Sequence, residues 1–157
     1  MSKLNSLTGI SGTYYAAAEL SKREYIALVT MKNTSGVDIL VSSEISKKSI
    51  VIQVKTSKLA HKKGYTLKNK DEELKSDDLV YIFVNMKDGN FRPDFYIVPS
   101  EIVAKTISDG HKKWSGEKGK RGQIRDGSSR IRKFYPSEEK DKENWKVIAE
   151  KLNSIPK

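Results

Sequence analysis

Three polar residues lie in two neighbouring apolar segments, and their types suit metal binding and phosphate chemistry. Asp38 lies in GVDILV at 36–41, and Gln53 and Lys55 lie in SIVIQVKTS at 49–57. Side chains alternate between the two faces of a strand, so Gln53 and Lys55 share a face. Polar side chains on a strand with an otherwise buried pattern are costly unless they are paired, so they need a partner or a function.

The hairpin register of these two segments predicts that the three residues meet at one end of a sheet. A hairpin centred near 46–47 places Asp38 about opposite Lys55, with Gln53 two residues away on the same face. A plain Asp38–Lys55 ion pair at a strand end would explain the same spacing without any chemistry. Spacing alone therefore leaves both interpretations open.

The order of the surrounding elements favours chemistry. A helix over 11–24 that carries Glu19, followed by GVDILV and IQVKTS, closely resembles the core of the PD-(D/E)xK nuclease superfamily over roughly residues 9–100. Its small resolvase-like and restriction-endonuclease-like members are the most similar. The resemblance implies an α/β fold with a restriction-endonuclease-like core. In such a core, a central mixed β-sheet is flanked by helices in αβββαβ order, here with an added C-terminal helix in a single domain over 1–157.

The resemblance also implies a Mg²⁺ site, in which Mn²⁺ could replace Mg²⁺. Asp38 matches the metal-binding acid of the family, Gln53 stands in the place of its second acid, and Lys55 matches its Lys. The backbone carbonyl of Val54 would join Asp38 and Gln53 around the ion. Glu19 matches the first-helix Glu that many members add as a further catalytic or metal-binding residue.

Two of these residues have other interpretations. Gln53 departs from the family acid: its amide oxygen still suits Mg²⁺, but one negative charge is lost and the ion would be held more weakly. Glu19 is spaced i,i+4 from Arg23, which fits a solvated helix pair worth a few tenths of a kcal/mol. In the implied hydrolysis, Lys55 would orient or help to deprotonate the attacking water and offset phosphate charge.

Positive charge is concentrated in two segments of a chain whose formal net charge is +10. Residues 45–70 contain eight lysines and no acid, and residues 105–133 contain ten Lys or Arg and three acids. Such clustering favours a nucleic-acid backbone track over a merely Lys-rich surface, with Trp114 and Tyr135 either stacking on bases or packing. The predicted nucleic-acid-binding residues are Lys58, Lys62, Lys63, Lys112, Lys113, Lys120, Arg121, Arg125 and Arg130.

The remaining pattern predicts strands over 25–30, 37–42, 49–56, 79–86 and 94–98, and a helix from Ser100. We expect residues 1–8 to be frayed, 70–75 to contain a helical turn, 109–133 to form a basic Gly-rich loop, and 137–153 to form a helix. In that last helix, an apolar stripe joins Trp145, Ile148, Ala149 and Leu152.

The sequence therefore predicts a cytoplasmic, metal-dependent endonuclease that acts on nucleic acid, with DNA as the expected substrate. The chain has no cysteine, which excludes disulfides and Cys-ligated zinc, and no apolar stretch long enough to span a membrane. A homodimer would supply the two sites that cutting two strands requires. The alternatives are a nucleic-acid-binding module that has lost cleavage and a protein-binding subunit of a defence or repair assembly.

Overall fold

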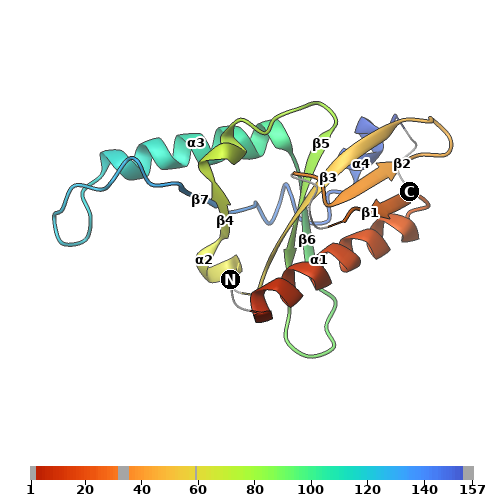
Figure 1. Cartoon of the computed structure of the whole chain (residues 1–157), viewed down its shortest axis with the longest axis horizontal. Coiled ribbons are helices and arrows are strands. Elements are labelled where there is room, and N and C mark those ends of the chain that lie inside the picture. Colours follow the sequence, from red (N-terminus) through yellow and green to blue (C-terminus); the bar gives the residue numbers. More distant parts are fainter. Residues whose placement is uncertain (1–2, 32–35, 59, 154–157) are drawn as a thin grey trace.

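The computed structural model describes residues 3–31, 36–58 and 60–153, and its centre is a mixed five-stranded sheet (Figure 1). The strand order is β1-β2-β3-β5-β6; β3 and β5 run parallel and every other pair is antiparallel. The elements of this sheet and its helices are α1 (Lys3–Lys22), β1 (Ile26–Val29), β2 (Ile39–Ser42), β3 (Ser49–Ser57), β5 (Leu79–Asn85), β6 (Asp94–Pro99), α3 (Ser100–Gly116) and α4 (Lys146–Lys151). The predicted α/β class, a central mixed sheet flanked by helices, is confirmed.

The two faces of the sheet bury different groups of side chains. On β5, Val80, Ile82 and Val84 point into one core with residues of α1 and α4. Tyr81 and Phe83 point to the other side, into a second core that includes Val103 and Ile107 of α3. The strand is therefore buried on both faces, as its unbroken apolar sequence predicts.

The first helix lies close against β3 and is longer than the sequence predicts. A Cβ at Gly12 would collide with the side chain of Thr56, so only glycine allows this approach of α1 to β3. The expectation that residues 1–8 fray is wrong from Lys3 onward, because the helix begins there. Ser11 lies inside the helix, where its hydroxyl donates to the carbonyl of Leu7.

A second, two-stranded sheet forms from two segments where the sequence predicts no strand. After the short helix α2 (Ala60–Lys63), the chain forms β4 (Tyr65–Lys68) and a 3-10 turn, η1 (Asn69–Glu72). β4 pairs in antiparallel fashion with β7 (Ile131–Phe134). The sequence predicts neither strand, because each has only four residues and lies between charged segments.

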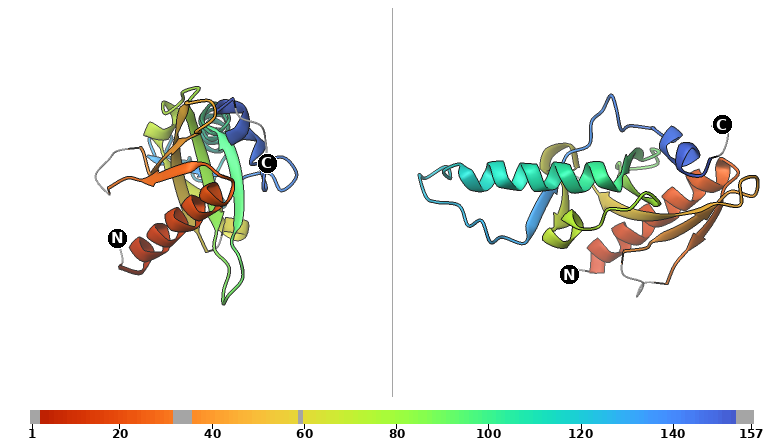
Figure 2. Two further views of the ribbon diagram at one scale, coloured as in Figure 1. Left: turned by 90° about the vertical axis from the view of Figure 1, so that its right-hand side faces the viewer. Right: turned by 90° about the horizontal axis from the view of Figure 1, so that it is seen from above.

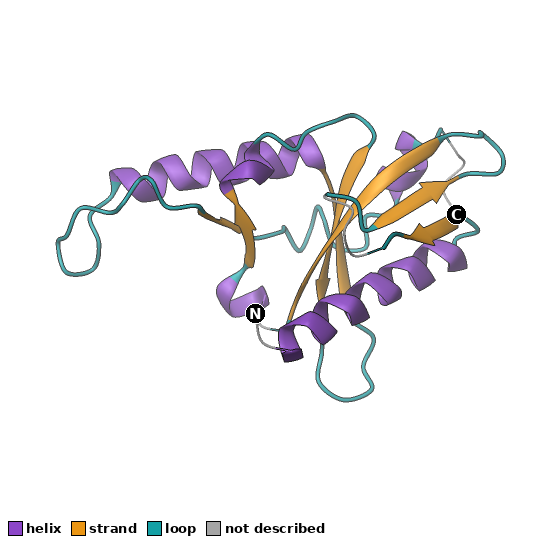
Figure 3. Ribbon diagram, in the orientation of Figure 1, coloured by secondary structure: helices purple, strands orange, loops and turns teal. Residues whose placement is uncertain are grey.

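The prediction of a loop over 109–133 is wrong at both ends, where the structure has a helix and a strand. Helix α3 continues to Gly116 and extends past the end of the main sheet, and only residues 117–130 connect it to β7 (Figures 2 and 3). In this extension His111 stacks on Trp114, with ring centroids 5.6 Å apart. The glycine at 110 does not end the helix, because by itself it costs only about 1 kcal/mol relative to Ala.

The C-terminal helix is shorter than predicted, although its core-facing stripe is confirmed. Helix α4 spans Lys146–Lys151, and turns occupy much of 137–145. Trp145, Ile148, Ala149 and Leu152 are all buried. Within the described ranges, none of the helices combines the length and apolar character needed to cross a membrane.

Candidate active site

Asp38 lies directly before β2, and the register of β2 with β3 fixes its neighbour. Ile39 pairs with Ile52, and the Asp38 N–H donates to the Ile52 carbonyl at 2.9 Å. This contact places Asp38 beside Ile52 and Gln53, so the predicted pairing with Lys55 is wrong by two residues. Strand alternation places Gln53 and Lys55 on one face of β3, and the negative charge of Asp38 acts on the hydroxyl of Tyr81, the β5 partner of Gln53.

The tight connection between the strands explains this shift. The Ser43 N–H donates to the Lys48 carbonyl at 3.0 Å, which closes the turn. Lys47 adopts a positive φ of 58° within it. The hairpin is therefore centred one residue earlier than the sequence-based estimate, and each partner on β3 moves by two.

The carboxylate of Asp38 binds a backbone N–H of β3 just beyond the end of the β2–β3 ladder. Its Oδ2 accepts a hydrogen bond from the Val54 N–H at 2.7 Å. In a strand, the N–H and C=O of one residue point to the same edge, so the Val54 carbonyl also faces the Asp38 side of β3. A carboxylate and a backbone carbonyl thus lie together where the β2–β3 ladder ends.

Gln53 is buried beside this pair, and its amide is not fully satisfied. The residue is 8% exposed. Its Oε1 atom has no hydrogen-bond partner among the residues that the structure describes. An unpartnered buried oxygen costs about 1–3 kcal/mol, so a ligand that supplies a positive centre would relieve that cost.

Lys55 lies beside a buried acid that sequence reasoning missed. Its Nζ is 4.0 Å from Oδ1 of Asp71, a residue of η1 whose side chain is 1% exposed. Asp71 also accepts hydrogen bonds from the Lys68 N–H at 2.7 Å and the Tyr81 hydroxyl at 3.2 Å. In the sequence, Asp71 is one charge in the charged run NKDEE, and nothing there marks it as buried.

The hydroxyl of Tyr81 lies close to two carboxylates, those of Asp71 and Asp38. It pairs with Gln53 in the β3–β5 ladder. Burial raises the pKa of the Tyr81 hydroxyl, and the negative charges of Asp71 and Asp38 raise it further. The hydroxyl therefore keeps its proton and donates to Asp71, within electrostatic reach of both carboxylates.

Glu19 does not join this group, contrary to prediction. It lies on α1 with the core on the opposite face of the sheet, where its carboxylate accepts from Arg23 at 2.7 Å and from Arg92 at 2.8 and 2.9 Å. Arg92 also binds Glu143 at 2.7 Å. The hydrogen bond from Arg92, with help from Arg23, lowers the pKa of Glu19 to about 2 against the opposing effect of burial.

The donor set on the Asp38 face fits Mg²⁺ with water completing its shell. Within residues 3–31, 36–58 and 60–153, no three His, Cys, Asp or Glu side chains are grouped as a metal site. Mg²⁺ prefers oxygen and is usually bound by one or two carboxylates while it keeps several waters. Asp38, the Gln53 amide and the Val54 carbonyl offer oxygen atoms of this kind, with one carboxylate among them.

The predicted basic residues are mostly exposed. Lys58 and Lys63 follow β3, Lys112 and Lys113 lie on α3, and Lys120, Arg121 and Arg130 lie on the connection to β7. Arg125 is the exception: it donates to the Trp114 carbonyl at 3.0 Å and to Glu117, with its guanidinium over the Trp114 ring. The Lys62 side chain lies outside the described part of the chain.

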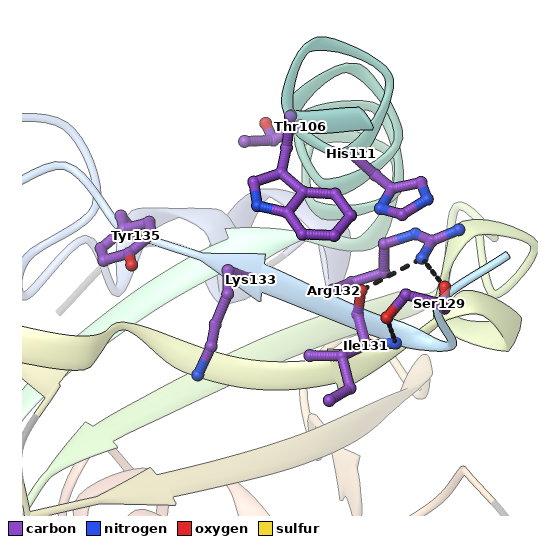
Figure 4. A pocket seen from close by; sticks show the side chains of 9 residues that line it. Thr106, His111, Ser129, Ile131, Arg132, Lys133 and Tyr135 are labelled. Atoms are coloured by element: carbon purple, nitrogen blue, oxygen red, sulfur yellow. Dashed lines mark hydrogen bonds between the residues drawn. The ribbon is translucent and has the colours of Figure 1, made fainter. Parts of the chain in front are cut away.

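Trp114 and Tyr135 are 40% and 60% exposed and line one pocket of about 580 Å³ between α3 and β7 (Figure 4). His111 and Arg132 line it too. Both aromatic residues are thus partly accessible to a ligand, and Trp114 also packs on His111.

No protein-family model matches the chain, and no curated protein is similar in sequence. Among solved structures, the chain is similar to a bacterial homing endonuclease, I-Ssp6803I, with 11% sequence identity and a TM-score of 0.54. The alignment covers 93% of both chains. At this identity the likeness shows a shared nuclease-like α/β fold.

Proposed function

We propose that this protein is a Mg²⁺-dependent endonuclease of the PD-(D/E)xK type that hydrolyses phosphodiester bonds of DNA. The observation that carries the proposal is that Asp38 bonds to the backbone of Ile52 and Val54, on either side of Gln53, whose buried oxygen has no hydrogen-bond partner among the described residues. Lys55 lies on the same face of β3 as Gln53. The exposed basic segments suit a polyanionic substrate. The fold shared with a homing endonuclease agrees with this interpretation.

Each residue has a distinct role in the proposed reaction. Asp38, Gln53 and the Val54 carbonyl would hold the ion. Mg²⁺ bound there would stabilise charge on the phosphate and leaving oxygen. Lys55 would donate hydrogen bonds to the attacking water or to a phosphate oxygen. Water would form the new P–O bond and release a proton to solvent, the bond to the leaving oxygen would break, and that oxygen would take up a proton from solvent.

Asp71 and Tyr81 act as positioning residues in this mechanism. Asp71 lies 4.0 Å from the Lys55 Nζ, so its negative charge attracts the lysine side chain and restrains its position. Tyr81 in turn holds Asp71 by a hydrogen bond. The site is therefore supported from β5 and η1 as well as from β3.

A panel of substrates tests the proposal. Linear, nicked, branched and single-stranded DNA, together with RNA, are incubated with the protein in Mg²⁺, in Mn²⁺ and in EDTA. We expect cleavage of at least one DNA substrate that EDTA abolishes. Cleavage that persists in EDTA would contradict the metal-dependent mechanism, and cleavage of RNA alone would contradict the substrate.

The second candidate is a DNA-binding protein with this fold that does not cleave, and Gln53 is the residue that favours it. An amide in place of a carboxylate removes one charge from the metal site. Filter binding that shows tight DNA association, with no cleavage of any substrate in Mg²⁺ or Mn²⁺, would establish this candidate instead.

The homodimer stays a prediction, and α1 offers the surface on which to test it. Leu7, Ile10 and Tyr14 follow one face of this helix and are 53%, 41% and 62% exposed. If a second copy packs there, Tyr14→Lys should convert a dimer to a monomer in sedimentation equilibrium. A parent protein that sediments as a monomer at all concentrations, with and without DNA, would contradict the prediction.

A further inference from the structure

The β4–β7 ribbon has one face anchored in the core and one face open to solvent. On the anchored face, Tyr65 and Phe134 pack on Phe83, with ring centroids 4.8 and 4.5 Å apart. The outer face presents four exposed side chains in two cross-strand pairs, Thr66 with Lys133 and Lys68 with Ile131. The proposed catalytic mechanism uses none of these four.

The outer face combines cations, a hydroxyl and an exposed apolar group. The Lys133 Nζ donates to the Thr66 hydroxyl at 2.6 Å, and Ile131 is 58% exposed. A hollow of about 550 Å³ lies against this face and is lined by Thr66, Leu67, Lys68, Asn69, Lys70, Arg130 and Ile131. None of these lining residues is acidic, so the charge of the hollow suits a polyanion.

Two contacts with η1 hold the ribbon in a fixed position relative to the candidate active site. The Lys68 N–H donates to Asp71, the acid beside Lys55. On the other strand, Arg132 is 8% exposed, pairs with Glu72 of η1 and donates to the Ser129 carbonyl. A side chain on the outer face is thus placed at a set distance from the bond to be cut.

We propose that the outer face of the β4–β7 ribbon enters the major groove of duplex DNA and reads base edges, which gives the protein a sequence preference. This inference rests on the proposed function, because it assigns the recognition surface of the same substrate. The major groove is about 12 Å wide and admits a two-stranded ribbon. Lys68 is suited to the acceptors of guanine, Thr66 to either acceptor or donor edges, and Ile131 to the thymine methyl. Lys70 and Arg130, at the margins, are suited to phosphates.

Selection from a random duplex library tests the inference. The parent protein selects its preferred duplex in EDTA, and affinities are then measured for that duplex and for a random one. The double variant Thr66→Ala/Lys68→Ala should lower the ratio of the two affinities by about tenfold or more. The matched variant Lys113→Ala, on exposed α3, should weaken both affinities alike and leave the ratio unchanged.

The outcomes separate this inference from the proposed function. A ratio that the double variant leaves unchanged would overturn the ribbon's role, and so would a parent that binds DNA but selects no sequence; neither result touches cleavage. A parent that binds no DNA at all would overturn both. Melting temperatures of the variants, and Ile131→Ala as a second ribbon variant, show that any loss does not come from misfolding.

Discussion

The candidate ligands on the two sides of the central sheet differ in how many of their oxygen atoms already have hydrogen-bond partners. On the α1 face, Glu19 is surrounded by Arg23 and Arg92, and Arg92 is shared with Glu143. On the other face, Asp38 accepts one backbone hydrogen bond at 2.7 Å and Gln53 has a buried oxygen with no partner in the described chain. Arginines therefore neutralise the carboxylate of Glu19, whereas oxygen atoms of Asp38 and Gln53 can still bind a ligand.

This difference separates a structural group from a candidate catalytic one. A carboxylate whose lone pairs are filled by arginines stabilises the fold but has little capacity left for a metal ion. Unfilled oxygen atoms beside a lysine cost stability, and that cost is expected where a ligand binds. Glu19 resembles a family ligand in its place in the element order, but here Arg23 and Arg92 bind its carboxylate.

The largest expected effect on cleavage follows from removing the carboxylate of Asp38. Asp38→Ala should lower the cleavage rate by at least about 100-fold, because it removes the only carboxylate proposed to hold the ion. It should also weaken Mn²⁺ binding about tenfold or more, measured by calorimetry without DNA. The control is Asp88→Ala, an exposed acid in the β5–β6 connection, which should change neither value. Parent-like metal binding by Asp38→Ala would remove Asp38 from the site.

Removing the charge of Glu19 should lower the stability of the protein and change its cleavage rate very little. Glu19→Gln should lower the free energy of unfolding at pH 7 by roughly 1–2 kcal/mol, a value that allows for solvent screening of the half-exposed Arg92. Urea denaturation measures this loss, and the cleavage rate should stay within about threefold of the parent. Glu150→Gln, in an exposed pair with Lys146, is the control with little effect. A stable Glu19→Gln protein that has lost cleavage would return Glu19 to the active site.

The same comparison predicts a pH dependence. Because the pKa of Glu19 in the folded protein is about 2, below its usual value near 4.5, its contribution to stability is complete above pH 4.5. That contribution is lost as the pH falls from about 4.5 to 2. The difference in unfolding free energy between the parent and Glu19→Gln should therefore shrink over this interval. A difference that is constant with pH would show that the ion pairs do not carry it.

A smaller effect is expected from restoring an acid at position 53. Gln53→Glu should tighten Mg²⁺ binding roughly three- to tenfold, because it adds a negative charge beside Asp38. Calorimetry in the absence of DNA isolates this change from any effect on turnover. Weaker binding by Gln53→Glu would indicate that the oxygen of Gln53 does not face the ion.

The smallest effect concerns the connection after α3. Each phosphate that a side chain neutralises contributes about 0.9 to the slope of log K against log salt, so replacing Lys120 and Arg121 by Ala should reduce that slope by up to about 1.8. Arg125 is left unchanged because it is bound to Glu117 and Trp114. Lys140→Ala, at an exposed site outside both basic segments, should leave the slope as it is. An unchanged slope in the double variant would show that DNA phosphates bind to other residues.

The sequence predicts the main sheet because its strands carry strong local signals. Residues 79–84 form an unbroken apolar run, and the alternation around Gln53 correctly assigns Gln53 and Lys55 to one face. The ribbon could have been suspected from Tyr65 and Leu67, which alternate with Thr66 and Lys68 at the period of a strand. Two such short segments, 66 residues apart, pair only through contacts that the whole fold supplies.

The long-range ion pairs in and around the candidate site could not be predicted from the sequence. Arg92 reaches Glu19 across 73 positions, and nothing local marks it as the partner that saturates that acid. Asp71 is equally hidden, because its burial depends on Tyr81 and on the backbone of Lys68. Register predictions fail for a related reason: the positive φ of Lys47 changes where the hairpin turns.

The most direct test of the proposed active site is the single-turnover cleavage rate of Lys55→Ala under saturating protein and Mg²⁺. We expect a rate at least about 100-fold below that of the parent, because the group that orients the attacking water is gone. DNA affinity should change little, since many other cations still bind the phosphates, and Lys22→Ala at the exposed end of α1 should behave like the parent. A Lys55→Ala protein that cleaves at the parent rate would contradict the proposed mechanism, because the reaction would then take place at another site.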